Sequence, residues 1–344
     1  MISYILKEPA CLEPQEEEKP IPHGSEVLVR VKYVGLCGSD IHLFRGTYSA
    51  PHNYPMRFGH EWSGVVEAVG EDVTRVAAGD LVTGDCSRYC GSCPNCEEDK
   101  NLCENIEKFG ITIDGASTEY FVRDEKYLYK SPDGVDERLL CLSEPVAVAA
   151  HLLSKIRRVL PEGFRNRQVL VLGGGVIGMS ALMLLIHMEN CQTAELYDLS
   201  ALRTGIAASE GARIPKGAEL NAEAGGTDYV SMYAAAKYDV VIETTGAASV
   251  FANAFRLVKP GGVLGSVGMM EKAEIPQRLI VTKALTVLGS IGGTGDFDRS
   301  MEFLRDYPHA AEKLISHTFP MTRATEAFST ARNPEESMKV VLSL

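Results

Sequence analysis

Four cysteines stand close together in the first half of the chain. Cys90, Cys93, Cys96 and Cys103 fall within 14 residues. Two residues separate Cys90 from Cys93 and Cys93 from Cys96, and six residues separate Cys96 from Cys103. Thiolates at this spacing can converge on one ion, and four of them complete a closed tetrahedral zinc site. The cluster therefore predicts a structural zinc, with an iron–sulfur cluster as the alternative. Cys86 lies four residues before the cluster, and we assign it no role.

A second group of possible metal ligands is dispersed along the chain. Cys37 follows an apolar segment, His60 and Glu61 are adjacent, and Glu144 stands in the string SEP. Each residue by itself is a weak signal, because single Cys, His and Glu residues usually have structural roles. Together they offer sulfur, nitrogen and oxygen donors, the mixed set of a catalytic zinc that keeps one position open.

A glycine-rich motif opens the second half of the chain. Gly173, Gly175 and Gly178 follow the apolar segment QVLVL and precede the apolar segment VIGMSALMLL, which begins with Val176 and Ile177. Such glycines allow a tight turn, a close approach to a pyrophosphate and close packing of helix on strand. The helix N-terminus that follows provides free amides and a partial positive charge. These residues predict a dinucleotide site.

An acidic residue follows the motif at the expected distance. Asp198 lies 20 residues after Gly178, at the end of a second apolar segment. A carboxylate there accepts hydrogen bonds from ribose hydroxyls and repels a 2′-phosphate, so NAD is favoured over NADP. Arg203 is placed either to stack on the adenine or to shield the Asp198 charge.

The segments that must position these residues change character near residue 146. Before it, alternating apolar and polar residues with frequent Gly and Pro predict a β-rich region. After it, apolar strands alternate with helical segments, which predicts a parallel sheet covered by helices. Beyond residue 288, two helices and a closing strand are expected. The fold class is therefore α/β.

Composition restricts the kinds of partner. Of the 344 residues, 34 are Lys or Arg and 46 are Asp or Glu, a net charge of −12 that argues against nucleic acid or an anionic membrane. No apolar stretch is long enough to span a bilayer, and the first residues lack the features of a secretory signal. We therefore expect a cytoplasmic protein with reduced cysteines and a small-molecule partner. An odd total of nine cysteines also argues against a closed set of disulfides.

The motifs and their order resemble the zinc-dependent medium-chain dehydrogenase/reductase family, within the alcohol dehydrogenase superfamily, and especially its sorbitol and polyol dehydrogenase branch. The resemblance runs through GLCGSDIH, GHEWSG, CGSCPNC, FGITIDGASTEY, SEPVAVAAH, VLVLGGGVIG and HTFPMTRATEAF. It implies a GroES-like catalytic domain over residues 1–146 and 288–344. A Rossmann NAD-binding domain is implied between them, over residues 147–287.

The resemblance also implies roles for individual residues. Cys37 and His60 match catalytic zinc ligands, Glu61 matches a third ligand, and Glu144 matches a residue that binds the zinc directly or through water. Ser39 and His42 match a proton relay. Backbone contacts to the nicotinamide are implied at Val267, Met269 and Ile291. The expected complement is two zinc ions per chain and NAD, in a homodimer or homotetramer.

Three departures from the family pattern bear on the substrate. The Cys96–Cys103 gap is six residues where seven is usual, so the loop that contains the four cysteines (residues 90–103, here called the metal loop) must be remodelled. Leu43 stands where sorbitol dehydrogenases have a substrate-contacting tyrosine, which argues against sorbitol. Trp62 gives the string GHEWSG, which also resembles 2-deoxy-scyllo-inosamine dehydrogenases.

We therefore predict hydride transfer between NAD and a secondary alcohol of a polyol, sugar alcohol or cyclitol. The alternatives are an aminocyclitol dehydrogenase such as 2-deoxy-scyllo-inosamine dehydrogenase, an L-threonine dehydrogenase, and a zinc-binding structural or interaction protein without catalysis. A zinc-free quinone reductase of the same fold is disfavoured, because such an enzyme needs neither set of metal ligands.

Overall fold

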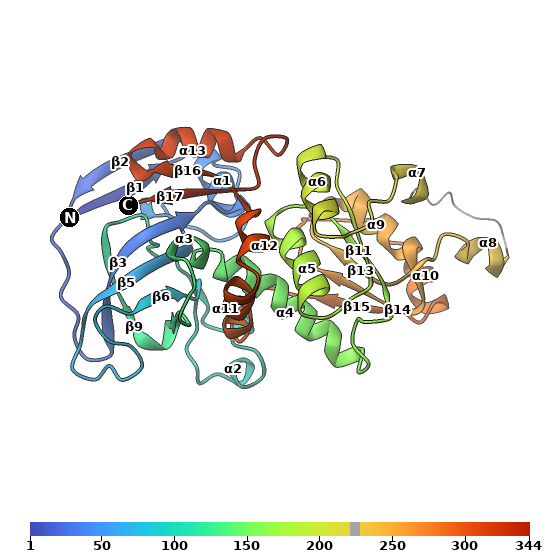
Figure 1. Ribbon diagram of the computed structural model, residues 1–344, viewed down its shortest axis with the longest axis horizontal. Helices are drawn as coiled ribbons and strands as arrows, with labels where there is room; N and C mark the ends of the chain where they lie inside the picture. Colours follow the sequence, from blue (N-terminus) through green and yellow to red (C-terminus); the bar gives the residue numbers. More distant parts are fainter. Residues whose placement is uncertain (221–227) are drawn as a thin grey trace. The chain divides into compact units, whose positions relative to one another are not determined.

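The computed structural model describes residues 1–220 and 228–344 and divides the chain into two compact units (Figure 1). The first unit contains residues 1–147 and 292–344, and the second contains residues 148–291. Helix α4 (Ser143–Val159) contains the first boundary between the units. Among the described residues, no helix is both long and apolar enough to cross a membrane.

The first unit is built on a seven-stranded sheet. Its strand order is β10-β6-β5-β3-β17-β16, and β9 also pairs with β3. Strands β16 and β17 run parallel to each other. Strand β17 also pairs antiparallel with β3, so the C-terminal segment completes this sheet. These strands are β3 (Glu26–Gly35), β5 (Glu61–Val69), β6 (Leu81–Gly84), β9 (Tyr120–Asp124), β10 (Leu128–Lys130), β16 (Ile315–Pro320) and β17 (Lys339–Ser343).

Smaller elements surround this sheet. A three-stranded sheet and a two-stranded ribbon comprise β1 (Ile2–Glu8), β2 (Cys11–Glu16), β4 (Met56–Arg57), β7 (Ser87–Arg88) and β8 (Glu107–Lys108). The helices are α1 (Gly38–Arg45), α2 (Pro94–Glu98), α3 (Glu137–Leu140), α11 (Phe297–Asp306), α12 (Pro308–Glu312) and α13 (Ala324–Ala331), with 3₁₀ turns η1 (Lys100–Leu102), η2 (Glu125–Tyr127) and η3 (Met321–Arg323).

Helix α1 is held by an aromatic core. The rings of Phe44 on α1 and Phe328 on α13 stack at 4.4 Å, and Phe58 meets Phe328 edge-on. Phe58 and Phe328 are almost fully buried, so this contact removes large apolar surfaces from water. Residues from the N-terminal and C-terminal segments therefore share one core, which fixes the helix that follows Cys37.

The second unit is built on a five-stranded parallel sheet with the order β12-β11-β13-β14-β15. Its strands are β11 (Gln168–Leu172), β12 (Thr193–Tyr197), β13 (Tyr238–Glu243), β14 (Val258–Ser266) and β15 (Thr286–Gly289). Its helices are α5 (Val176–His187), α6 (Ala201–Ser209), α7 (Gly217–Leu220), α8 (Tyr229–Tyr233), α9 (Ala248–Leu257) and α10 (Gln277–Thr282). The predicted α/β class and the parallel sheet are confirmed.

Candidate metal and cofactor sites

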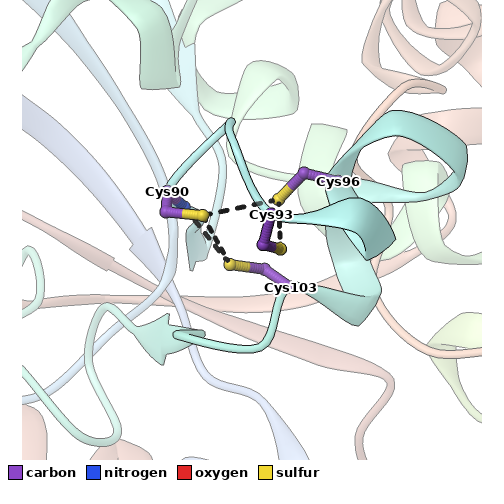
Figure 2. Close-up of side chains that lie close together, drawn as sticks. All are labelled: Cys90, Cys93, Cys96 and Cys103. Carbon is purple, nitrogen blue, oxygen red and sulfur yellow. Dashed lines mark hydrogen bonds between the residues drawn. The ribbon is translucent and has the colours of Figure 1, made fainter.

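The four clustered cysteines converge in the first unit (Figure 2). The Sγ atoms of Cys90 and Cys96 are 3.9 Å apart, those of Cys93 and Cys96 3.5 Å, and those of Cys103 and Cys90 3.6 Å. A tetrahedral zinc with bonds of about 2.3 Å requires sulfur–sulfur distances of about 3.8 Å. The spacing in the structure therefore matches a four-thiolate zinc site.

The backbone of the metal loop favours a thiolate at Cys90, whereas burial raises the pKa of Cys96 to about 12. Hydrogen bonds from the amides of Ser92 and Cys93 lower the pKa of Cys90 to about 5. Helix α2 starts directly after Cys93 with Pro94 in its first turn, and Cys103 directly follows η1. The six-residue gap thus contains the end of α2 and the short turn η1, and it still brings Cys103 to the cluster.

The second donor group also lies in the first unit. One possible ligand atom from each of Cys37, His60 and Glu61 lies within 4.8 Å of the others. Cys37 immediately precedes α1, and Glu61 is the first residue of β5. His60 and Glu61 are buried, whereas Cys37 is partly exposed. The dispersed sequence signals therefore meet where β3, α1 and β5 join.

Asp40 is buried beside this group and contacts its backbone and the His60 ring, and sequence reasoning did not single it out. Its carboxylate accepts hydrogen bonds from the amides of Cys37 at 2.8 Å and Gly59 at 3.3 Å. Its Oδ1 lies 3.8 Å from Nδ1 of His60. Burial opposes ionisation of His60, but Asp40 and Cys37 hold its pKa well above the ordinary value. A carboxylate behind a histidine in this way orients the ring toward a metal.

Lys339 from the C-terminal strand forms a buried ion pair with Glu61, and this residue was also missed. Its Nζ lies 2.7 Å and 2.5 Å from the two carboxylate oxygens and donates to the carbonyl of Leu36 at 3.0 Å. Burial disfavours the charged amine, yet Glu61 and Cys37 raise the pKa of Lys339 above its ordinary value. Lys339 therefore remains a cation beside the three possible ligands.

Glu144 lies near this group but is not one of the three converging donors. It is buried near the start of α4, and burial raises its pKa while the attraction of His60 opposes that rise. The thiol of Cys86 is hydrogen-bonded to it. Cys86, for which the sequence suggested no role, thus contacts a predicted site residue through the tertiary fold.

The two predicted relay residues lie on α1. Ser39 Oγ is enclosed and has no hydrogen-bond partner among the residues that the structure describes. Nδ1 of His42 lies 2.9 Å from Oγ1 of Thr47, and the ring is exposed. One residue therefore presents an unpaired hydroxyl near Cys37, and the other reaches solvent one turn later.

The glycine motif of the second unit forms the turn between β11 and α5. Gly173 has a φ of 99°, which favours glycine, and Gly175 immediately precedes the helix. A Cβ atom on Gly178 would lie 1.9 Å from the carbonyl oxygen of Gly173. Strand and helix therefore pack at a distance that only glycine permits. Val176 and Ile177 form the first turn of α5.

The predicted ribose-binding carboxylate lies beside this turn. Asp198 follows β12 and accepts a hydrogen bond from the amide of Gly174 at 2.6 Å. Nη1 of Arg203 lies 3.5 Å from the same carboxylate oxygen. Arg203 thus partly neutralises Asp198, which is one of the two roles that the sequence suggested.

The predicted nicotinamide contacts follow the last two strands of the parallel sheet. Val267 comes directly after β14 and Ile291 lies two residues after β15, where the amide of Ser290 donates to the carbonyl of Ser266 at 3.0 Å. Met269 and Ile291 are 71% and 45% exposed. They share the carboxyl edge of the sheet with the glycine turn, where ligands bind in open parallel sheets.

Comparisons with known proteins decide the family. Residues 23–133 match the alcohol dehydrogenase GroES-like domain, and residues 138–344 match the glucose dehydrogenase C-terminus. The chain belongs to the zinc-dependent medium-chain dehydrogenase/reductase family. This dehydrogenase is 30% identical to the starvation-sensing protein RspB of Escherichia coli, with 100% of this chain and 99% of RspB covered. It is also 30% identical to a sorbitol dehydrogenase of Halalkalibacterium halodurans, with 96% and 94% covered.

A solved structure supports the same assignment. The RspB protein of E. coli CFT073, crystallised with NADH, superimposes with a TM-score of 0.87 at 28% identity, covering 100% of this chain and 99% of RspB. The resemblance to the polyol branch is confirmed, and the protein is an NAD-dependent zinc alcohol dehydrogenase. The residues present fit both cofactors, because two sets of metal donors converge and the glycine turn from β11 into α5 leaves no room for a Cβ atom on Gly178.

Proposed function

We propose that this dehydrogenase oxidises a secondary alcohol of a polyol, sugar alcohol or cyclitol, with transfer of hydride to NAD. The observation that carries the proposal is the group formed by Cys37, His60 and Glu61. It offers three donors of different kinds and leaves a fourth position for a substrate oxygen. A four-thiolate site has no such position, so catalysis is assigned to the first group and stability to the second.

We assign Cys37, His60 and Glu61 as the protein ligands of the catalytic zinc, with Glu144 as the neighbouring carboxylate. When bound there, zinc acts as a Lewis acid that stabilises negative charge on an oxygen. Asp40 holds the His60 ring, and Lys339 balances the charge of Glu61.

The proton of the alcohol leaves along α1. Ser39 Oγ, enclosed and unpaired among the described side chains, accepts it, and His42 releases it to water. Bound NAD would supply a ribose hydroxyl that could link these two side chains. His42 suits this step because an imidazole has an unperturbed pKa near 6.5 and exchanges protons with solvent at neutral pH.

NAD is held by the second unit. The turn from Gly173 to Gly178 and the N-terminus of α5 bind the pyrophosphate, and Asp198 accepts hydrogen bonds from the ribose hydroxyls. Val267, Met269 and Ile291 contact the carboxamide. NAD carries the hydride, and these residues determine where its reactive carbon is placed.

One apolar residue and one aromatic residue affect which substrate can bind. Leu43 is fully buried and supplies no polar group. Tyr48 is half-buried, and burial together with the charges of Cys37 and Asp40 raises its pKa. We assign Tyr48 as a phenol that faces the substrate, in place of the tyrosine that sorbitol dehydrogenases carry at the position of Leu43.

The test is a panel of sugar alcohols, sugar phosphates, cyclitols, aminocyclitols and L-threonine with NAD, followed by NADH absorbance. We expect turnover with at least one polyol or cyclitol, and loss of that turnover in Cys37→Ser. Preference for an aminocyclitol such as 2-deoxy-scyllo-inosamine, or for L-threonine, would select one of the two alternative dehydrogenases. No turnover with any alcohol would refute the proposal and favour a non-catalytic zinc protein.

We also propose a homodimer or homotetramer. Strand β15 is an edge strand of the parallel sheet, and its Val287 is 40% exposed, so this edge is where a second copy could pair. Light scattering of the purified full chain measures the assembly, and a monomeric mass would refute this proposal.

A further inference from the structure

Asn101 in the metal loop holds a segment that is distant in the sequence. Its side chain is almost fully buried. Oδ1 accepts a hydrogen bond from the amide of Thr294 at 3.1 Å, and Nδ2 donates to the carbonyl of Thr294 at 3.1 Å. The side-chain amide therefore pairs with the backbone of one residue at both of its polar groups, as a neighbouring strand would.

The same side chain is fixed to the metal loop. Oδ1 of Asp99 accepts hydrogen bonds from the backbone amide of Asn101 at 2.9 Å and from its Nδ2 at 2.8 Å. Asn101 lies within η1, which directly precedes the predicted zinc ligand Cys103. The position of the Asn101 amide is thus set by the loop between Cys96 and Cys103.

Gly292 makes the contact tight from the other side. Its φ of 70° favours glycine, and a Cβ atom there would lie 2.1 Å from Oδ1 of Asn101. Gly292 is the first residue of the C-terminal part of the first unit, directly after Ile291. Asn101 therefore contacts the chain at Gly292 and Thr294, immediately after Ile291, the residue proposed to contact the nicotinamide.

We propose that Asn101 is a positioning residue through which the four-thiolate zinc site holds residues 292–294, and with them Ile291, in place for NAD. This inference rests on the proposed nicotinamide contact of Ile291. Metal binding and loop folding are coupled in such sites, because four like-charged thiolates repel one another unless an ion neutralises them. An ordered loop presents the Asn101 amide in one orientation, so the structural zinc acts on the cofactor site without touching it.

The test uses hydrogen exchange and NADH binding in the full chain, neither of which requires turnover. In Asn101→Ala we expect about tenfold faster exchange at the amides of residues 293–296, because two hydrogen bonds to the segment are lost. We expect NADH affinity, measured by fluorescence, to fall by a similar factor while both zinc ions are retained. Asn95→Ala is the matched control. Asn95 donates to Leu102 within the same loop, and its replacement leaves both readouts unchanged.

Two further variants test the link to the metal. Cys103→Ser should reproduce the faster exchange and weaker NADH binding, and adding Asn101→Ala to it should cause little further change. Gly292→Ala, which displaces Asn101 from the opposite side, should produce the same two effects. Additive effects of Cys103→Ser and Asn101→Ala, zinc loss in Asn101→Ala, or unchanged NADH affinity despite faster exchange would each overturn the inference. Absence of turnover in the wild type would refute the proposed function but would leave these binding measurements valid.

Discussion

The buried pair between Lys339 and Glu61 yields a quantitative prediction. Lys339→Met preserves most of the side-chain volume but removes the cation that contacts both oxygens of Glu61, at 2.7 Å and 2.5 Å. Lys339 and Glu61 are 3% and 1% exposed, so water cannot replace the lost partner without rearrangement. Removing one member of a buried pair typically costs about 3–5 kcal/mol. In a unit of this size the change lowers the unfolding midpoint by roughly 6–20 °C.

Thermal unfolding of protein from which the catalytic zinc has been removed, followed by circular dichroism, measures this loss, because a bound ion would itself balance the charge of Glu61. Because the pKa of Lys339 is raised above its ordinary value of 10.5, the wild-type amine stays charged at neutral pH and its contribution decreases only as pH rises through that higher pKa. The stability difference should therefore be constant between pH 7 and pH 9.

A double-mutant cycle separates the ion pair from simple loss of packing. Adding Glu61→Gln to Lys339→Met removes the uncompensated charge, so the double variant should be more stable than the sum of the two single losses indicates. Additive losses, or a loss below about 1 kcal/mol for Lys339→Met, would refute the electrostatic account of this pair.

Four other substitutions test the assigned sites. Cys37→Ser should lower turnover about a thousandfold, because a Lewis acid contributes several kcal/mol, while calorimetry shows NAD binding unchanged; full turnover would contradict the ligand assignment. Cys103→Ser should reduce zinc, measured by atomic emission, from two ions per chain to one and lower the unfolding midpoint; two retained ions would disprove the four-thiolate site. Asp198→Ala should raise the KM for NAD about tenfold through two lost hydrogen bonds and shift preference toward NADP. An unchanged cofactor ratio would reject its ribose role. Tyr48→Phe should raise the KM for the substrate severalfold with little change for NAD, and equal KM values in the two proteins would exclude a substrate contact.

The local chemistry of this protein could be predicted from spacing. Four thiols within 14 residues form a compact group, and six residues between Cys96 and Cys103 suffice to bring the last thiol to the others. The glycine motif likewise depends on a strand, a turn and a helix that are consecutive in the chain. Short segments have few conformations, so their residue order largely determines which groups meet.

The dispersed residues around Cys37 could be grouped by the kinds of donor atom they offer, but part of their environment could not be predicted. Asp40 lies inside a quoted motif, yet its role depends on the approach of His60, which directly precedes β5. Cys86 gained a contact only because α4 brings Glu144 to it.

What the sequence by itself determined is the four-cysteine set, the glycine turn and the alternation of strands and helices, because each depends on neighbouring residues. The tertiary structure alone decided that Lys339 meets Glu61 across 278 positions and that Asn101 meets Thr294 across 193. No local pattern encodes such pairs. They form because strand pairing and the burial of apolar side chains bring distant segments together, and a buried charge or amide must then find its partner there.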